Sequence, residues 1–247
     1  MSASITSRSP KDLPDFSSLA SLESVSPDAF RSSDKAEQEV CNFVLALALA
    51  HNDFKDLLWA FNNISAYKPQ KFEVNPVNGQ WNGMRLHILK LLYSLVVEVS
   101  RLIKEKPKPQ QHERFTKAFN EMSAENRKHW NSLYEFAQDT SQDNLMKVLS
   151  SARNKISFHY DTKFISQGYE KHFSGKGPEQ KRAYASRGSS LRDSRFYFAD
   201  AAAGAGFGLV ESQEKDLVQR LRDIATAIYN LVGRFIQAQG KFAWREE

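Results

Sequence analysis

Three side chains near the middle of the chain have the chemistry needed to cleave a phosphodiester. Arg153 and Asn154 are adjacent, and His159 follows shortly after them in the stretch SSARNKISFHYD, residues 150–161. A histidine titrates near neutral pH and can act as a general base or a general acid. An arginine carries a permanent charge and donates from a planar fork to phosphate oxygens. Asn154 can orient the phosphate or fix the tautomer of the histidine.

RNA is the phosphodiester that suits this set of groups, because it carries its own nucleophile, the 2′-hydroxyl. Cleavage needs a base for that hydroxyl, an acid for the departing 5′-oxygen, and positive charge beside the phosphorus. A single histidine supplies only half of the acid–base pair. A two-fold axis through the site would bring the same histidine from a second copy and complete the pair.

A helix predicted over about 142–159, after a cap at Thr140 and Ser141, must position these groups. With a turn of about 100° per residue, its apolar stripe consists of Leu145, Leu149, Ala152 and Ile156. Arg153 and His159 flank this stripe on opposite sides, about 120° apart. They do not stack on a regular helix, so the length of the arginine or a break near Ser157 must bring them together. The alternative is that both residues brace a helix end, where a cation is favourable.

The sequence RNKISFH at 153–159 resembles the signature of the HEPN superfamily, in which an arginine and a polar residue precede a histidine by a few positions. The longer stretch RNKISFHYD looks most like members linked to abortive-infection and toxin–antitoxin systems. The resemblance is specific over 142–161 and architectural elsewhere. It implies a metal-independent, cofactor-free endoribonuclease that works as a homodimer, with Arg153, Asn154 and His159 at the dimer interface. A toxin or defence effector of this kind would have an antitoxin or other regulatory protein as a partner.

Many members of the superfamily bind rather than cleave, so a second interpretation is a non-catalytic helical module that binds RNA or a protein. A third, a purely structural bundle, requires the motif and the basic stretch that follows it to be accidental.

Three further residues are candidates for supporting roles at the motif. Ser157 lies near Arg153 on the predicted helix, and Tyr160 follows the histidine directly. The third, Glu98, lies in an apolar run of the helix predicted over about 80–105, and its carboxylate can orient Arg153 or His159 from there. The polar stripe of this predicted helix consists of His87, Lys90, Ser94, Glu98 and Arg101. Alternatively, that stripe is simply the solvated face of the helix.

A basic and aromatic stretch follows the motif and is predicted as an irregular insertion over about 161–211. Residues 171–195 carry a charge of +5, equal to the net charge of the whole chain. The candidates for RNA binding are Lys171, Lys176, Lys181, Arg182, Arg187, Arg192 and Arg195. Aromatic residues lie among them, and this combination suits the phosphates and bases of single-stranded or tRNA-like RNA. Alternatively, the insertion is a loop whose aromatic side chains pack on the bundle, or a docking site for an acidic protein partner.

Other chemistries find little support in the sequence. Cys41, the only cysteine, lies in the apolar run VCNFVLALALA and is expected to be a packed core residue, in a reducing cytoplasm. The histidines show no zinc-ligand spacing with it. The glycines in AAAGAGFG are not followed by Lys and Ser or Thr, so a nucleotide-binding P-loop is not predicted. Mean hydropathy is −0.54, and no apolar run reaches the length of a membrane span.

Turn signals and apolar periodicity predict one all-α domain preceded by a tail. Residues 1–34 are rich in Ser and expected to be disordered. Residues 35–247 are expected to form a single HEPN-like domain, a bundle of about five long helices with the insertion before the last helix. Besides 80–105 and 142–159, helices are expected over about 36–66, 110–122 with 124–139, and 212–239. Asp34 and Glu37 have capping-box spacing, and Ser123 is a cap between 110–122 and 124–139.

Overall fold

The computed structural model describes residues 25–66, 76–138, 140, 161–175, 181–186, 194–207 and 211–238. The described residues are largely helical, so the predicted all-α class is confirmed. Their helices are η2 (Pro27–Phe30, a 3-10 helix), α1 (Lys35–Ala66), α2 (Pro76–Glu105), α3 (Pro107–Gln111), α4 (Glu113–Asn120), α5 (Ala124–Ala137), α7 (Thr162–Phe173), α8 (Tyr197–Phe207) and α9 (Glu211–Gln237). In place of a strand, the described part of the chain has an isolated antiparallel bridge between Ser186 and Arg195.

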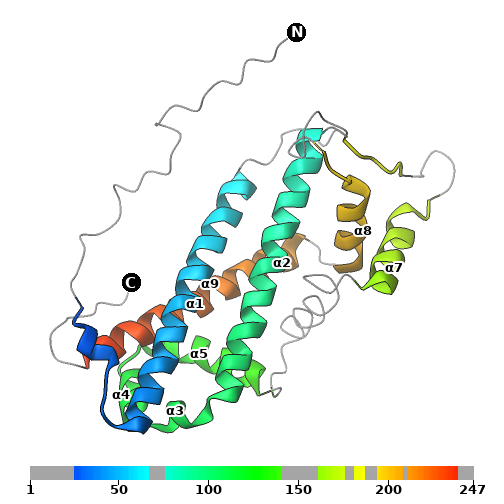
Figure 1. The fold of residues 1–247 in the computed structure, drawn as a ribbon. Helices are drawn as coiled ribbons and strands as arrows, with labels where there is room; N and C mark the ends of the chain where they lie inside the picture. Colours follow the sequence, from blue (N-terminus) through cyan, green and yellow to red (C-terminus); the bar gives the residue numbers. More distant parts are fainter. Residues whose placement is uncertain are drawn as a thin grey trace, which may run out of the picture.

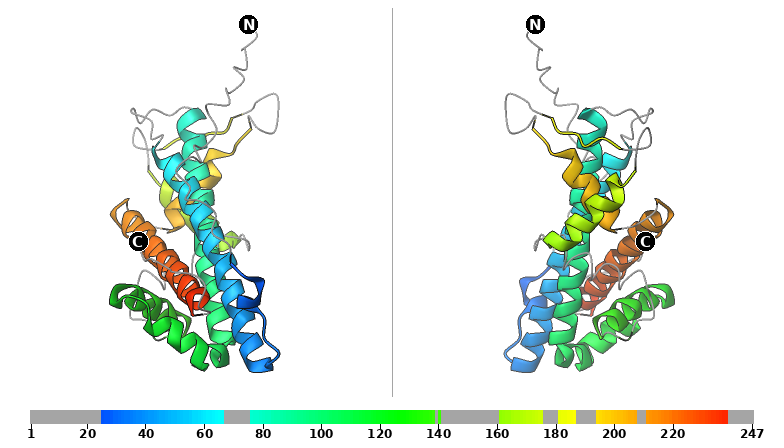
Figure 2. Two further views of the ribbon diagram at one scale, coloured as in Figure 1. Left: turned by 90° about the vertical axis from the view of Figure 1, so that its left-hand side faces the viewer. Right: turned by 90° about the vertical axis from the view of Figure 1, so that its right-hand side faces the viewer.

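Two long helices, α1 and α2, form the axis of the molecule. They lie side by side and run antiparallel, and α9 packs across them against α1 (Figure 1). Helices α3, α4 and α5 lie toward the end of the pair where α2 ends, and α5 and α9 lie on the same side of it (Figure 2). Near the other end, α7 and α8 form a hairpin whose α8 packs against α2. Residues 161–175, 181–186 and 194–207 are called the arm from here on.

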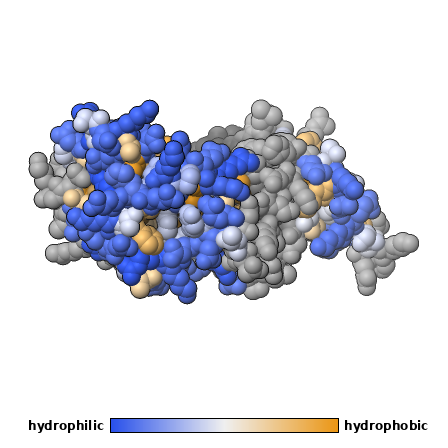
Figure 3. All heavy atoms as spheres, turned by 90° about the horizontal axis from the view of Figure 1, so that it is seen from below, coloured by the Kyte–Doolittle hydropathy of each residue, from blue (hydrophilic) through white to orange (hydrophobic). Residues whose placement is uncertain are grey.

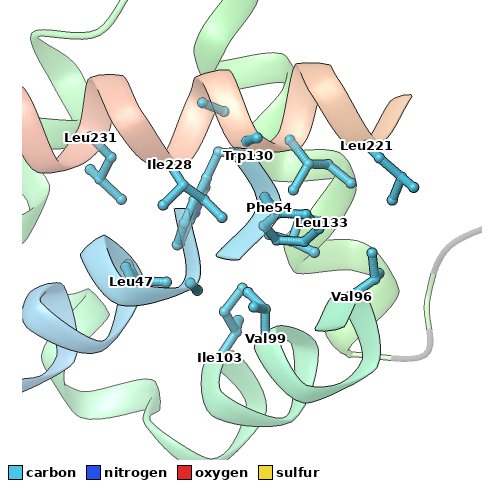
Figure 4. Close-up of a cluster of buried hydrophobic side chains, with 14 of the residues drawn as sticks. Leu47, Phe54, Val96, Val99, Ile103, Trp130, Leu133, Leu221, Ile228 and Leu231 are labelled. Atoms are coloured by element: carbon cyan, nitrogen blue, oxygen red, sulfur yellow. The ribbon is translucent and has the colours of Figure 1, made fainter. Parts of the chain in front are cut away.

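The main core forms where α1, α2, α5 and α9 face one another. Apolar residues recur every three or four positions along these helices, which places them on one face. Figure 4 shows side chains from all four helices meeting between the ribbons. The labelled residues, all buried, are Leu47, Phe54, Val96, Val99, Ile103, Trp130, Leu133, Leu221, Ile228 and Leu231. Burying each such large side chain stabilises the fold by about 1.5–3 kcal/mol.

The outer surface contrasts with this core. Seen from the end where α3 and α4 lie, the described surface is largely hydrophilic, with only small apolar patches (Figure 3). Among the described helices, none combines the length and the apolar character needed to cross a membrane.

Several predicted helix limits and caps are confirmed. Helices α1, α5 and α9 match the predicted segments closely. Asp34 Oδ1 accepts a hydrogen bond from the Glu37 backbone N–H at 2.8 Å, and Ser123 Oγ accepts one from Asn126 N–H at 3.3 Å. Helix α2 begins at Pro76, earlier than predicted, because proline fits the first turn, where no backbone N–H is needed.

The prediction of a disordered tail is wrong for its last part, residues 25–34. Ser26 Oγ caps η2 by accepting a hydrogen bond from Asp28 N–H at 3.3 Å. Ala29 is buried, and the ring of Phe30 stacks on Phe235 of α9 with centroids 5.9 Å apart. These long-range contacts order a segment whose composition alone favours disorder. Residues 1–24 lie outside the described residues.

The prediction of an irregular insertion is wrong for the two segments that form α7 and α8. Glycine lets these helices approach closely. A Cβ atom on Gly168 would overlap the backbone carbonyl of Ala202, and one on Gly206 would overlap the ring of Phe164. The stretch AAAGAG therefore lies within helix α8, where its small side chains allow close packing, rather than in a loop.

Two differences remain along the chain between α2 and α7. In place of the single helix predicted over about 110–122, the structure has α3, which begins at Pro107, and α4, with His112 between them. The helix predicted over 142–159, one of the five long helices of the predicted bundle, lies outside the described residues.

Candidate functional site

The structure describes only some of the predicted site residues. The predicted residues that lie outside the described ranges are Arg153, Asn154, Ser157, His159, Tyr160, Lys176, Arg187 and Arg192. Those that it describes are Glu98, Lys171, Lys181, Arg182 and Arg195. The catalytic hypothesis therefore stays a prediction, and the candidate site among the described residues lies at the arm.

A cavity of about 780 Å³ lies between the N-terminal part of α2 and the arm. Two of the predicted RNA-binding residues, Lys181 and Arg182, line it. Aromatic side chains from three parts of the arm line it as well: Phe173, Tyr184, Tyr197 and Phe198. Helix α2 contributes Gly79, Asn82 and Leu86. We call this hollow the arm cavity.

Two glycines of α2 allow the arm to pack closely against this helix, and one of them, Gly79, lines the arm cavity. Gly79 and Gly83 are one turn apart and therefore share a face of the helix. The ring of Tyr197 lies over Gly79, and its hydroxyl donates to the Pro76 carbonyl at 3.2 Å. The guanidinium of Arg195 lies over Gly83, where a Cβ atom would overlap it. Larger side chains at these two positions would push the arm away.

Arg195 connects the arm to α2. Its Nε donates to Asp200 Oδ2 at 2.7 Å, and its Nη1 lies 3.5 Å from Gln80 Oε1. About a quarter of each partner's side chain is exposed, so the ion pair is largely withdrawn from water. The predicted RNA-binding residue Arg195 thus has its guanidinium committed to holding the arm, and it neutralises the carboxylate of Asp200 at the cavity.

Backbone hydrogen bonds fix the segment that carries Lys181, Arg182 and Tyr184. Ser186 N–H donates to the Arg195 carbonyl at 2.8 Å, and Arg195 N–H donates back at 3.2 Å. Phe198 N–H donates to the Tyr184 carbonyl at 3.2 Å. These bonds tie residues 184–186 to the start of α8, so Tyr184 is held at the cavity although 41% of it is exposed.

The electrostatics around the cavity are basic. Burial, together with the charge of Lys181, lowers the pKa of His172, which also lines the cavity. A smaller hollow of about 270 Å³ adjoins Arg195 and includes His87 and Lys90 of α2. Burial lowers the pKa of both groups; the charge of Arg195 adds to this effect, and the carboxylate of Asp200 opposes it. Burial thus disfavours the charged forms of all three groups.

The remaining described candidates lie elsewhere or have other partners. Lys171 Nζ donates to the Ala205 carbonyl at 3.3 Å, near the end of α8, where a cation complements the helix dipole. Glu98 is exposed on α2 and pairs with Arg101 at 3.1 Å, with about half of each side chain in water. Because Arg153 and His159 lie outside the described residues, a role for Glu98 beside them stays a prediction.

Sequence reasoning missed His172, Asn82 and the two docking glycines. The available signal was the spacing of Gly79 and Gly83, one helical turn apart, which is typical of a close approach by another segment. It does not indicate which segment approaches, since Gly79 and Tyr197 are far apart in the chain.

The prediction that Cys41 is a packed core residue is confirmed. The thiol is fully buried, and its Sγ lies 3.1 Å from Arg114 Nη1. Burial raises the pKa of the thiol despite the nearby guanidinium, so Cys41 is a packing residue rather than a nucleophile. Within the described ranges, no three or more His, Cys, Asp and Glu side chains gather in a way that could hold a metal ion.

Comparison of the chain with known protein families, characterised proteins and solved structures finds no match.

Proposed function

We propose that this chain is a metal-independent endoribonuclease of the HEPN type, with Arg153, Asn154 and His159 as its reacting groups. The observation that carries the proposal is the sequence RNKISFH at 153–159, in a chain whose described part is all-α. The arm cavity supports RNA as the substrate, since cations and aromatic side chains line it together.

In the proposed reaction the 2′-oxygen of a nucleotide attacks the adjacent phosphorus as His159 removes its proton. The bond from phosphorus to the 5′-oxygen breaks, and the same histidine of a second copy donates a proton to that oxygen. Arg153 stabilises the negative charge that develops on the phosphoryl oxygens. The products are a 2′,3′-cyclic phosphate and a free 5′-hydroxyl. The proposed reaction therefore consumes no metal or cofactor.

In cells, a ribonuclease of this kind would act as a toxin or defence effector, restrained by an antitoxin or another regulatory protein. The proposed enzyme is a cytoplasmic homodimer. The second candidate function is RNA binding without cleavage, and the specific observation that favours it is the arm cavity, which needs no catalytic residue to bind a strand.

End-labelled single-stranded RNA and tRNA, incubated in EDTA with the wild type, H159A or R153A, test the proposal. We expect cleavage by the wild type with 2′,3′-cyclic phosphate ends, and its loss in both variants. The matched controls H129A and R31A, far from the motif in sequence, should cleave normally. Cleavage that survives H159A and R153A, or no cleavage by the wild type, would refute the catalytic proposal and leave RNA binding as the leading function.

A further inference from the structure

We infer that the arm cavity binds one nucleotide of a single-stranded RNA, with the base against Tyr184 and Phe173 and the phosphate at Lys181 and Arg182. This inference rests on the proposed function for the identity of the polymer. It concerns binding alone, so it can be tested even if the chain does not cleave RNA.

The size of the cavity selects a single nucleotide. At about 780 Å³ it falls within the range of sites that enclose a small ligand, so it cannot admit a duplex. It lies between α2 and all three segments of the arm, and it is therefore concave rather than a flat protein-binding surface. A splayed base of a single strand has the size and flat shape to enter it.

The aromatic side chains offer stacking surfaces. Tyr184 lines the cavity with 41% of its surface exposed, and Tyr169 is exposed beside Phe173, with ring centroids 4.6 Å apart. Aromatic side chains left partly exposed on a fixed backbone can stack on any base with little ordering cost. The exposed amide of Asn82, on the opposite wall, has both a donor and an acceptor for the edge of a base.

The charge of the cavity fits a phosphate. Lys181 and Arg182 are both exposed at its rim, and Arg195 neutralises Asp200, which carries the one carboxylate among the described lining residues. Among these described residues, a strand entering the cavity therefore meets two cations without an uncompensated anion. The segment 171–195 carries a charge of +5, which suits neighbouring phosphates of the same strand better than an isolated nucleotide.

Fluorescence anisotropy with a short labelled RNA, in the H159A background to prevent cleavage, tests the inference. We expect Y184A to weaken binding about 5- to 150-fold, because one stacked base contributes about 1–3 kcal/mol. Y184F keeps the ring and should bind nearly normally. The matched control is Y134A on α5, which removes a tyrosine that is 39% exposed and far from the cavity.

The charges are tested by salt dependence. The double variant K181Q/R182Q should reduce the slope of log affinity against log salt by about 1.4, as expected for two phosphate contacts on a single strand. The control R31Q/K128Q removes two exposed cations, Arg31 directly after η2 and Lys128 on α5. It should leave the slope unchanged. Thermal unfolding of each variant checks that its fold is intact.

Competitors identify the ligand. Duplex RNA of the same sequence should bind more weakly than the single strand, and 5′-AMP should compete only at much higher concentration. Equal binding by the duplex, or by 5′-AMP, would overturn the assignment to a strand. If both Y184A and K181Q/R182Q bind with wild-type affinity, the arm cavity is not the binding site, even if the motif variants abolish cleavage. If Y184A and K181Q/R182Q lose binding but the wild type does not cleave RNA, the proposed ribonuclease activity alone is refuted, and the binding site stands.

Discussion

Arg114 joins η2, α1 and α9 to its own helix, α4, through one guanidinium. Its Nη1 donates to Glu37 Oε1 at 3.0 Å, its Nη2 donates to the Ala29 carbonyl, and its charge lies 4.1 Å from the centroid of the Phe235 ring. Only 9% of its side chain is exposed. The Ser32 hydroxyl and this guanidinium together hold the pKa of Glu37 below its ordinary value. The arginine thus makes the order of residues 25–34 depend on the rest of the bundle.

Replacing Arg114 by Met should therefore lower the free energy of unfolding by about 2–3 kcal/mol, because partly buried partners lose a charged donor. Urea denaturation followed by circular dichroism measures this change. The control R31M breaks an exposed pair with Asp28 at 3.9 Å and should cost less than about 1 kcal/mol. Equal losses in the two variants would show that Arg114 contributes only as a surface charge does.

The sequence is informative about single residues where one property decides their environment. Cys41 is predicted correctly because an apolar run around a lone thiol indicates burial, and Ser123 because a cap depends on its own helix. Arg195 is assigned to RNA binding from its charge, whereas Asp200 and Gln80 hold it in the structure. Gln80 is distant in sequence, so composition cannot reveal that pairing.

At the scale of the elements, the α7–α8 hairpin depends on glycines at helix contacts. Gly168 faces the backbone of Ala202, which cannot move aside as a flexible side chain would. Gly204, on α8, has no atom within 4 Å of the place where its Cβ would be. The two positions therefore respond differently to the same substitution, although both are helical glycines.

We expect G168A to separate α7 from α8 and to speed amide hydrogen exchange in both helices. G204A should keep or increase their protection, since alanine favours a helix interior over glycine by about 1 kcal/mol. Hydrogen exchange with mass spectrometry distinguishes the two variants within one experiment. If G168A slowed exchange as much as G204A, helix propensity rather than close packing would control the stability of the hairpin.

Differences in composition explain which helices can be predicted from the sequence and which cannot. The long helices α1, α5 and α9 are found because apolar periodicity and caps agree along each of them. Helix α8 is missed because its alanines and glycines give no clear apolar stripe. Helices α7 and α8 contact each other, and α8 also contacts α2. Tertiary packing overrides local propensity at these segments.

At the scale of the whole molecule, the proposed chemistry and the cavity belong to different parts of one chain. Residues 153–159 fall in sequence between α5, which belongs to the bundle core, and α7, which begins the arm. The arm is fixed to α2 through Arg195 and Tyr197, so the cavity is held at a set position relative to the bundle. A strand bound at the cavity is therefore presented to the rest of the molecule in a defined orientation.

The proposed function predicts separate kinetic effects for the arm cavity and for the motif at 153–159. Y184A should raise KM about tenfold with little change in kcat, because stacking at the cavity stabilises the bound strand and the transition state equally. H159A should instead abolish kcat, since it removes the proton-transfer group. Steady-state cleavage of a labelled single-stranded RNA, with Y134A as control, measures both parameters. A Y184A enzyme with lowered kcat and unchanged KM would mean that the arm acts on the reacting groups rather than on strand binding.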